Sequence, residues 1–292
     1  YNAQTSRLDL VQEVWEFTII PFLNVKELAL LRPTCKWCNK QWQEFLKRNT
    51  FSVPEQVPTI DEAMRVGFNL AIQKEYTKEC PLVVVLSAGE HVVEESWTNS
   101  HGHVYENILA ITCSNILFVG QGKDKTTVCG GILSNKKNVT LKNLTLTNPN
   151  GFGLVVKGEE ALMELISVAV KRCQNSGIDV TTGASVKATQ CEISENSECG
   201  IDLDERGKSY FRDCTFHHNG EDGVAATGEG TLVELHGEQT EIHHNADFGF
   251  SAMSNATIHI YIPSRSITAV VHDHVEEELL GLADEDSDLY TD

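Results

Sequence analysis

The sequence has no long apolar run and little positive charge. No apolar stretch approaches the ~18 residues that a membrane-spanning helix needs, so no transmembrane segment is predicted. The 292 residues carry 23 Lys and Arg against 42 Asp and Glu, which gives a formal net charge of −19. A surface of this sign repels polyanions. We therefore expect neither nucleic acid nor a membrane as a partner.

The acids gather at the C-terminal end of the sequence. Residues 273–292 hold nine Asp or Glu and no Lys or Arg. Such a composition is typical of disorder, because it offers little apolar surface to bury and its charges repel one another. Residues 276–292 are therefore predicted to form an acidic, disordered tail.

The region 138–262 repeats itself roughly every two dozen residues. Asparagine recurs with this period at Asn196, Asn219 and Asn245. A fixed period of this length indicates a solenoid, whose units bury their apolar faces by stacking. Five glycines, each followed by an apolar residue, mark the period with spacings of 24, 23, 23 and 26: Gly153, Gly177, Gly200, Gly223 and Gly249.

The content of one repeat indicates the kind of solenoid. In residues 185–207, three short stretches alternate apolar and polar residues, and polar or glycine-rich corners separate them. Alternation of period two is typical of strands with one buried face, and no repeat contains a ten-residue helical pattern. The predicted fold is mainly β, a right-handed parallel β-helix, with equivalent residues stacked about 4.8 Å apart. We expect the asparagines to form a ladder that satisfies backbone groups at an inward corner.

The nine cysteines are best explained as reduced thiols. Cys191 and Cys214 hold equivalent positions in neighbouring repeats, and we expect both to point into the core, where a free thiol packs as a small apolar group. Reduced cysteines are usual inside cells. An intracellular location, cytoplasmic or nuclear, is therefore predicted.

Residues 8–49 have a different pattern, with apolar residues at helical spacing and prolines that break the run. Four groups of residues occur in order here: Phe22-Leu23, Glu27-Leu28, Leu30-Leu31-Arg32 and Cys35-Lys36. This order resembles the second half of an F-box. The resemblance implies that residues 1–50 dock the Skp-type linker subunit of a cullin-type ubiquitin ligase. The docking residues it implies are Pro21, Phe22, Leu23, Leu28, Leu31 and Cys35. The alternative is an amphipathic helical cap.

The next segment has the pattern of an entry to a β-helix. Residues 51–80 are predicted to be a linker and a capping helix, with Thr59 or Asp61 as N-cap. A buried strand at residues 82–86 and a further coil at 115–122 follow. This order is similar to the start of pectinesterase-like and other right-handed β-helix proteins. We assign the β-helix to residues 81–275.

Two sets of polar residues are candidate sites on the predicted coils. Asp179 and Asp202 each follow a repeat glycine by two places, so they should stack on neighbouring coils, where two carboxylates could bind Ca²⁺ or share a proton. Each alternates between apolar residues, however, and the next coil has Ala225 at this position. This is the pattern of an ordinary solvated strand face.

The second set consists of histidines. His217-His218 and His243-His244 should stack into two pairs, close enough in principle for a transition metal. No third shared ligand is evident in the sequence, and a tolerant repeat corner explains the histidines equally well. Cys35 and Cys38 form a CxxC without the second pair that a zinc site needs. No catalytic residue, metal or cofactor is assigned.

The enzyme signatures of related folds are missing. The sequence lacks the Gly-Thr-Val-Asp and Arg-Pro-Trp of pectinesterases and the Asn-Thr-Asp and Gly-His-Gly of polygalacturonases. Three functions remain open. The first is a non-catalytic adaptor, the F-box substrate receptor of a ubiquitin ligase, with its target on the β-helix. The second is a carbohydrate-binding or carbohydrate-active protein, with lyase or hydrolase activity. The third is a structural subunit of a larger assembly.

Overall fold

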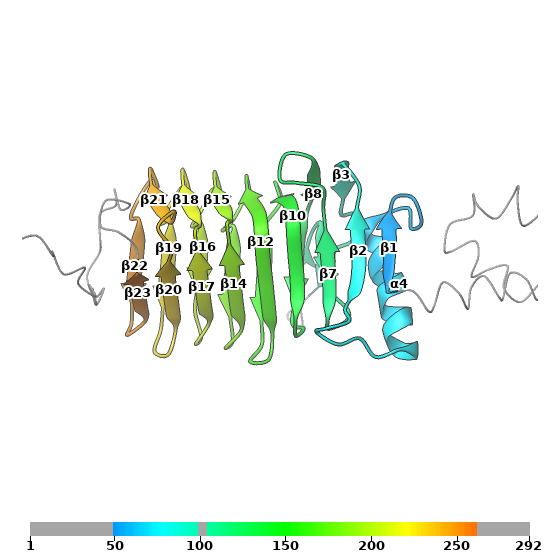
Figure 1. Ribbon diagram of the computed structural model, residues 1–292. Coiled ribbons are helices and arrows are strands. Elements are labelled where there is room, and N and C mark those ends of the chain that lie inside the picture. Colours follow the sequence, from blue (N-terminus) through cyan, green and yellow to red (C-terminus); the bar gives the residue numbers. More distant parts are fainter. Residues whose placement is uncertain (1–48, 99–103, 262–292) are drawn as a thin grey trace, which may run out of the picture.

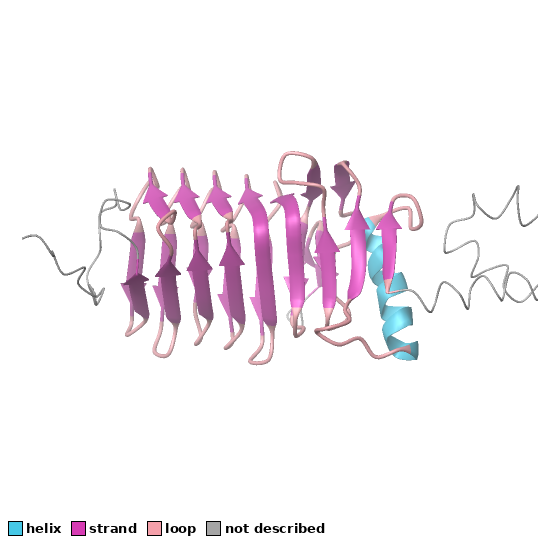
Figure 2. Ribbon diagram, viewed as in Figure 1, coloured by secondary structure: helices cyan, strands magenta, loops and turns pink. Residues whose placement is uncertain are grey.

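The computed structural model describes residues 49–98 and 104–261, and over these ranges the chain winds into a parallel β-helix (Figure 1). One full turn is made of three short strands, as in β14 (Ser185–Thr189), β15 (Glu192–Ser194) and β16 (Ile201–Leu203). The predicted fold class and the three strands per turn are confirmed. The strands run almost parallel across the solenoid and leave its corners as loops (Figure 2).

The main path of the longest sheet runs the length of the solenoid, with every strand parallel to its neighbours. Its strands, in spatial order, are β1 (Thr50–Val53), β2 (Leu82–Leu86), β7 (Ile116–Val119), β10 (Val139–Thr147), β12 (Leu162–Lys171), β14, β17 (Lys208–Arg212), β20 (Leu232–His236) and β23 (Thr257–Tyr261). The later halves of β10 and β12 belong to a second row, as their pairing shows: the later half of β10 pairs with β8, and the later half of β12 pairs with β15.

Two further rows complete the coils. The second row contains β3 (Gly89–Val92), β8 (Thr126–Cys129), β15, β18 (Thr215–His217) and β21 (Glu241–His243). The separate third sheet contains β6 (Ile108–Ala110), β9 (Gly131–Ser134), β11 (Leu154–Lys157), β13 (Ile178–Thr181), β16, β19 (Val224–Thr227) and β22 (Phe250–Met253). A short antiparallel pair, β4 (Trp97–Thr98) and β5 (Val104–Tyr105), lies outside these rows.

Helix α4 (Ile60–Gln73) lies at the N-terminal end of the solenoid (Figure 1), where Gly67 faces Leu82 of β2. It begins where the sequence predicts a cap, because the Thr59 hydroxyl accepts a hydrogen bond from the Glu62 amide at 3.2 Å. The helix buries Ile60, Ala63 and Met64 against the core. No helix among the described residues is long and apolar enough to cross a bilayer.

The interior follows from strand alternation. Inward residues of successive coils stack directly, so Ala188, Phe211 and Leu235 form one continuous buried row. Phe216 meets Phe211 edge to face, with ring centroids 5.2 Å apart. Burial of a large apolar side chain contributes about 1.5–3 kcal/mol, and each coil alone could not exclude water from such rows.

The asparagine ladder is confirmed. The Asn196 side-chain amide donates to Oδ1 of Asn219 at 2.9 Å, and the Asn219 amide donates to Oδ1 of Asn245 at 2.9 Å. The same oxygens accept from the backbone amides of Asn196 and Asn219. Cys173 occupies this position in the preceding coil, and its amide donates to Asn196 at 3.1 Å. The ladder therefore supplies hydrogen-bond acceptors to backbone amides at a buried corner that lies outside the paired strands.

The repeat glycines are vertical neighbours. The amides that follow Gly177 and Gly200 donate to the carbonyls of Gly200 and Gly223, both at 3.1 Å. A Cβ at Gly200 would lie 2.5 Å from the Gly223 oxygen and 2.8 Å from the Asn219 amide nitrogen. The marker residue is glycine because the next coil and the asparagine ladder fill the space beside it.

Two details differ from the sequence-based expectation. The stretch assigned to a linker includes strand β1, which pairs with β2 and buries Phe51 and Val53. Strand β2 was expected to be buried throughout, but Val83 and Val85 are half-buried on its outer side. An unbroken apolar strand does not reveal that one of its faces lies outside the core. The predicted helical module up to residue 48 and the acidic tail lie outside the described residues.

Candidate functional site

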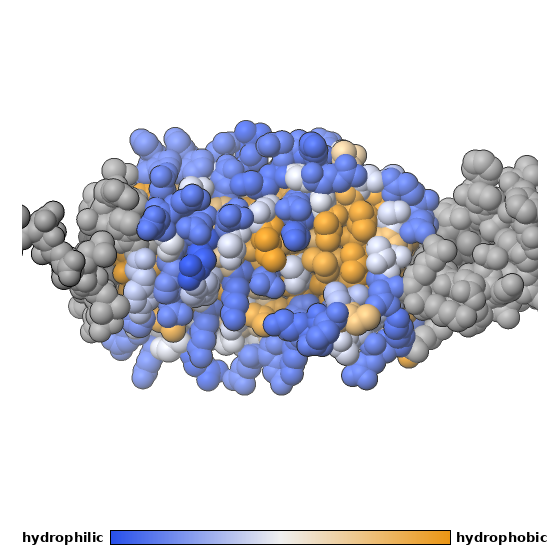
Figure 3. Space-filling view, viewed as in Figure 1, coloured by the Kyte–Doolittle hydropathy of each residue, from blue (hydrophilic) through white to orange (hydrophobic). Residues whose placement is uncertain are grey.

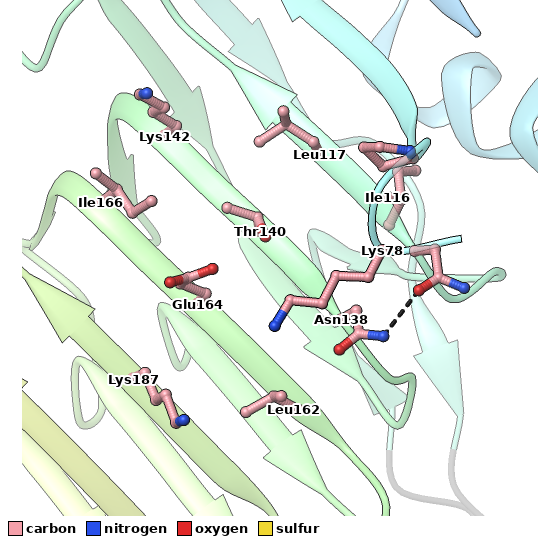
Figure 4. Close-up of a pocket in the computed structure, with 12 residues that line it drawn as sticks. Lys78, Ile116, Leu117, Asn138, Thr140, Lys142, Leu162, Glu164, Ile166 and Lys187 are labelled. Carbon is pink, nitrogen blue, oxygen red and sulfur yellow. Dashed lines mark hydrogen bonds between the residues drawn. The ribbon is translucent and has the colours of Figure 1, made fainter. Parts of the chain in front are cut away.

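The outer face of the main sheet carries a groove of about 270 Å³ between the loop before β2 and strands β7 to β14 (Figure 4). Leu117, Leu162 and Ile166 give it apolar side chains, and all three are half-buried. They face outward because they alternate with inward residues along their strands. Figure 3 shows the apolar surface over β2 and β7 on this face, with hydrophilic side chains around it.

The groove is positively charged. Three of the residues that line it are lysines, Lys78, Lys142 and Lys187, and Glu164 is its one acid. Within the described residues, none of the three ammonium groups is in an ion pair with a carboxylate. Because the whole chain carries a net charge of −19, these unpaired cations are a local exception that favours an anionic ligand.

One wall of the groove is a loop fastened to the sheet. The Asn115 side chain donates to the Tyr76 carbonyl at 2.7 Å, and its Oδ1 accepts from the Asn138 amide at 2.8 Å (Figure 4). This chain of hydrogen bonds joins the loop that carries Lys78 to two successive coils. The groove is therefore largely pre-formed, which lowers the entropic cost of binding.

Asp179 and Asp202 are brought together, as the repeat predicts. They are register partners on β13 and β16, and Ala225 follows in the next coil. Burial of Asp179, followed by repulsion from Asp202 and Asp204, raises its pKa to about 7. Asp202 is exposed along part of its side chain, yet desolvation of its carboxyl and the charge of Asp204 also raise its pKa. The pair lies on the third sheet, not in the groove.

The four histidines also stack as predicted. The rings of His217 and His243 are 5.1 Å apart and nearly parallel, and those of His218 and His244 are 5.2 Å apart. Within each coil the two Nδ1 atoms lie 2.8 Å from each other. Burial, followed by a neighbouring histidine, lowers the pKa of His217 and His243. In this arrangement the two rings of each coil hydrogen-bond one another through Nδ1.

The described part of the chain contains no group of three or more His, Cys, Asp or Glu arranged to hold a metal ion. For the histidines the reason is geometric, since Nδ1 of each ring is directed at its neighbour. The carboxylates nearest to His217 and His243 are Glu192 at 3.7 Å and Glu241 at 3.9 Å, both on the Nε2 side of the rings.

The buried thiols Cys191 and Cys214 lie at equivalent inward positions, as predicted. Each donates a hydrogen bond to a carbonyl two residues earlier at 3.3 Å. Thr240 occupies the same position in the next coil and donates to the His236 carbonyl. Both thiols are buried among apolar side chains of the core, so their role is packing.

The residues implied by the F-box resemblance, from Pro21 to Cys35, lie outside the described residues, as does Cys38. The groove, in contrast, was missed at the sequence level. A sequence signal was present, because Leu117, Leu162 and Ile166 are apolar residues at outward strand positions, which are more often polar. The lysines that line it are far apart in sequence, and only stacking brings Lys142 and Lys187 to one face.

Several solved structures resemble the chain, at low sequence identity and with TM-scores below 0.5. ORF18 of Geobacillus virus E2 matches with a TM-score of 0.46 and 13% identity, and the match covers 77% of this chain and 52% of that one, about half its length. A pectin methylesterase from Yersinia enterocolitica matches with a TM-score of 0.45 and 14% identity over 70% of this chain and 81% of the enzyme. Pectate lyase Pel9A gives a TM-score of 0.43 and 12% identity over 72% and 73%.

No curated protein matches the chain. The family model described as "Right handed beta helix region" matches residues 109–262, which is more than half of the sequence and includes the repeats described above. The handedness expected from the sequence agrees with this match, and the chain belongs to the right-handed β-helix family.

Proposed function

We propose that this chain is a non-catalytic binding protein that recognises its target in the lysine-rimmed groove. The observation that carries the proposal is the groove itself, which has an apolar lining and unpaired cations on an otherwise acidic protein. Parallel coils hold these side chains on a rigid sheet. A pre-formed site of this kind suits an extended, anionic segment of a partner protein.

The groove lacks the residues that hydrolysis of a glycosidic bond requires. Such enzymes generally use two carboxyl groups that face each other across the substrate, whereas Glu164 is the one acid lining the groove. The carboxylate pair Asp179 and Asp202 belongs to another sheet. Binding without catalysis therefore fits the groove better than an enzymatic role.

The N-terminal segment gives the proposal its second half. Residues 21–35 resemble an F-box, and such a module would connect the chain to a Skp-type linker subunit of a ubiquitin ligase. In this proposal Leu23 and Leu28 belong to the docking surface, and the groove selects what is brought to the ligase. The two surfaces carry separate partners, so each can be disabled without the other.

Affinity capture with full-length variants tests both halves. The double variant Lys142→Glu/Lys187→Glu should lose the target and keep the linker subunit, because it reverses two charges at the groove only. The variant Leu23→Asp/Leu28→Asp should do the opposite. Lys123→Glu/Lys125→Glu is the matched control, since it makes the same charge change at the corner before β8. Retention of every partner by the groove variant would refute the proposal.

Carbohydrate binding is the second candidate, because lysines also suit the carboxylates of an acidic sugar polymer. Sugar-binding grooves commonly offer an aromatic face, and no aromatic residue lines this one. The aromatic ladder Tyr210, His236 and Tyr261 stacks on itself with centroids 4.5 and 4.4 Å apart, which covers the ring faces. Binding of an acidic oligosaccharide that Lys142→Glu/Lys187→Glu abolishes would favour this candidate.

A further inference from the structure

We infer that the acidic C-terminal stretch of this chain, residues 273–292, docks in the lysine-rimmed groove and competes there with the target. The inference rests on the proposed function of the groove and adds its regulation. It follows from three properties of the groove and of the stretch: charge, apolar content and position.

The charges are complementary. Lys78, Lys142 and Lys187 are without ion-pair partners among the described residues, and the stretch carries nine acids and no Lys or Arg. Three of the acids, Glu276 to Glu278, are consecutive. Attraction between such groups is modest at an exposed surface, so charge alone would give only loose association.

The apolar parts match as well. Leu279, Leu280 and Leu282 follow the three acids directly. The groove offers half-buried Leu117, Leu162 and Ile166 beside its lysines. A segment that places its leucines on this lining and its carboxylates on the lysine rim would bury apolar surface at about 25 cal/mol per Å². The combination distinguishes this stretch from a purely acidic linker.

The stretch can reach the groove. Tyr261 ends β23 in the same outer row of the sheet as His236, Arg212, Thr189, Ile166 and Lys142. Since neighbouring coils are about 4.8 Å apart, β23 lies roughly 15 Å from β14 and roughly 30 Å from β7 along the sheet. The 14 residues from Tyr261 to Val275 can span up to about 45 Å.

Because the stretch is tethered to the β-helix, a weak contact is enough to occupy the groove for most of the time. A segment joined to its site by a short chain acts at an effective concentration of about a millimolar. If it occupies the groove nine-tenths of the time, it lowers the apparent affinity for a competing target about tenfold. Removal of the stretch, or loss of its charge, should therefore activate binding.

Lysine reactivity in the full-length protein tests the inference. An N-hydroxysuccinimide acetylating reagent would be applied to three proteins: the full chain, the chain ending at His272, and the full chain with Glu276→Gln/Glu277→Gln/Glu278→Gln. Mass spectrometry should show Lys142 and Lys187 modified about tenfold faster in the second and third, with Lys125 unchanged as internal control. Equal rates at Lys187 in all three proteins, or an equal rise at Lys125, would overturn the inference.

A synthetic peptide of residues 273–292 provides the direct measurement. Its fluorescence anisotropy should rise with the chain ending at His272 and should not rise with the same chain carrying Lys142→Glu/Lys187→Glu. No binding to the unaltered truncated chain contradicts the inference. Target capture by the truncated chain is a separate readout. If groove substitutions abolish capture although the peptide does not bind, the proposed function stands and only the docking of the tail fails.

Discussion

Replacement of Asn219 by alanine is expected to destabilise the β-helix more than any other single change in the asparagine ladder. Its side chain makes four hydrogen bonds: it accepts from the backbone and side-chain amides of Asn196, and it donates to the carbonyl of Ile193 and to Oδ1 of Asn245. Asn219 is 2% exposed, so water cannot replace the lost partners.

The magnitude follows from these bonds. A net hydrogen bond contributes about 1 kcal/mol, and a buried polar group left without a partner costs about 1–3 kcal/mol. Asn219→Ala leaves the backbone amide of Asn196 in that condition and also removes a donor to the Ile193 carbonyl. We expect a loss of about 3 kcal/mol in the free energy of unfolding. Asn245→Ala should cost less, because Asn245 is half-buried and makes three such bonds.

Urea unfolding followed by circular dichroism measures the difference. Asn150→Ala is the matched control, since Asn150 is exposed and its side-chain amide donates to Asn107 at 2.7 Å. Surface changes of this kind usually stay within about 0.5 kcal/mol. If Asn219→Ala differs from Asn150→Ala by no more than that amount, the ladder does not stabilise the stack and the reasoning is wrong.

Three further predictions concern the same stack. Gly200→Ala should lower the melting temperature strongly, because the added Cβ would meet the next coil. Gly151→Ala should be tolerated, because the nearest atom to its Cβ would be 3.5 Å away. Thermal unfolding of the two variants compares them. The raised pKa of Asp179 means that the folded protein holds a proton that the unfolded chain has released, so stability falls as the pH rises from about 4 to about 7. Asp179→Asn should flatten that part of the profile in urea titrations, and an unchanged slope would contradict the assignment. The lowered pKa of His243 has the opposite consequence: stability is present at neutral pH and is lost as the pH falls below about 6.5, because the unfolded chain takes up the proton more readily. His243→Gln should reduce this loss in the same urea titrations, and an unchanged loss below about pH 6.5 would contradict the assignment.

The repeat was readable because its markers have local physical causes. Glycine recurs where the next coil leaves no room for a Cβ, and asparagine recurs where one side chain must both donate and accept. The cap of α4 at Thr59 was readable for a similar reason, since it depends on residues three apart. Strand β1 was not readable, because four residues with two buried side chains give too short a signal.

For the candidate sites, too, the sequence predicted some features and not others. Stacking of Asp179 on Asp202 and of His217 on His243 follows from a constant period, so the sequence alone placed them together. Their protonation depends on burial and on charges from other coils, which no spacing reveals. Lys78, Lys142 and Lys187 do not share one repeat position, and Lys78 comes from a loop outside the repeats.

The sequence by itself therefore determined the solenoid, its period and its ladders, because these depend on contacts between equivalent residues of neighbouring coils. The tertiary structure alone decided where the lysine-rimmed groove lies. A groove is a property of the gap between a loop and a sheet, and its charge is the sum of groups that come from different coils. Such sums depend on distances across the fold, which the order of residues along the chain does not contain.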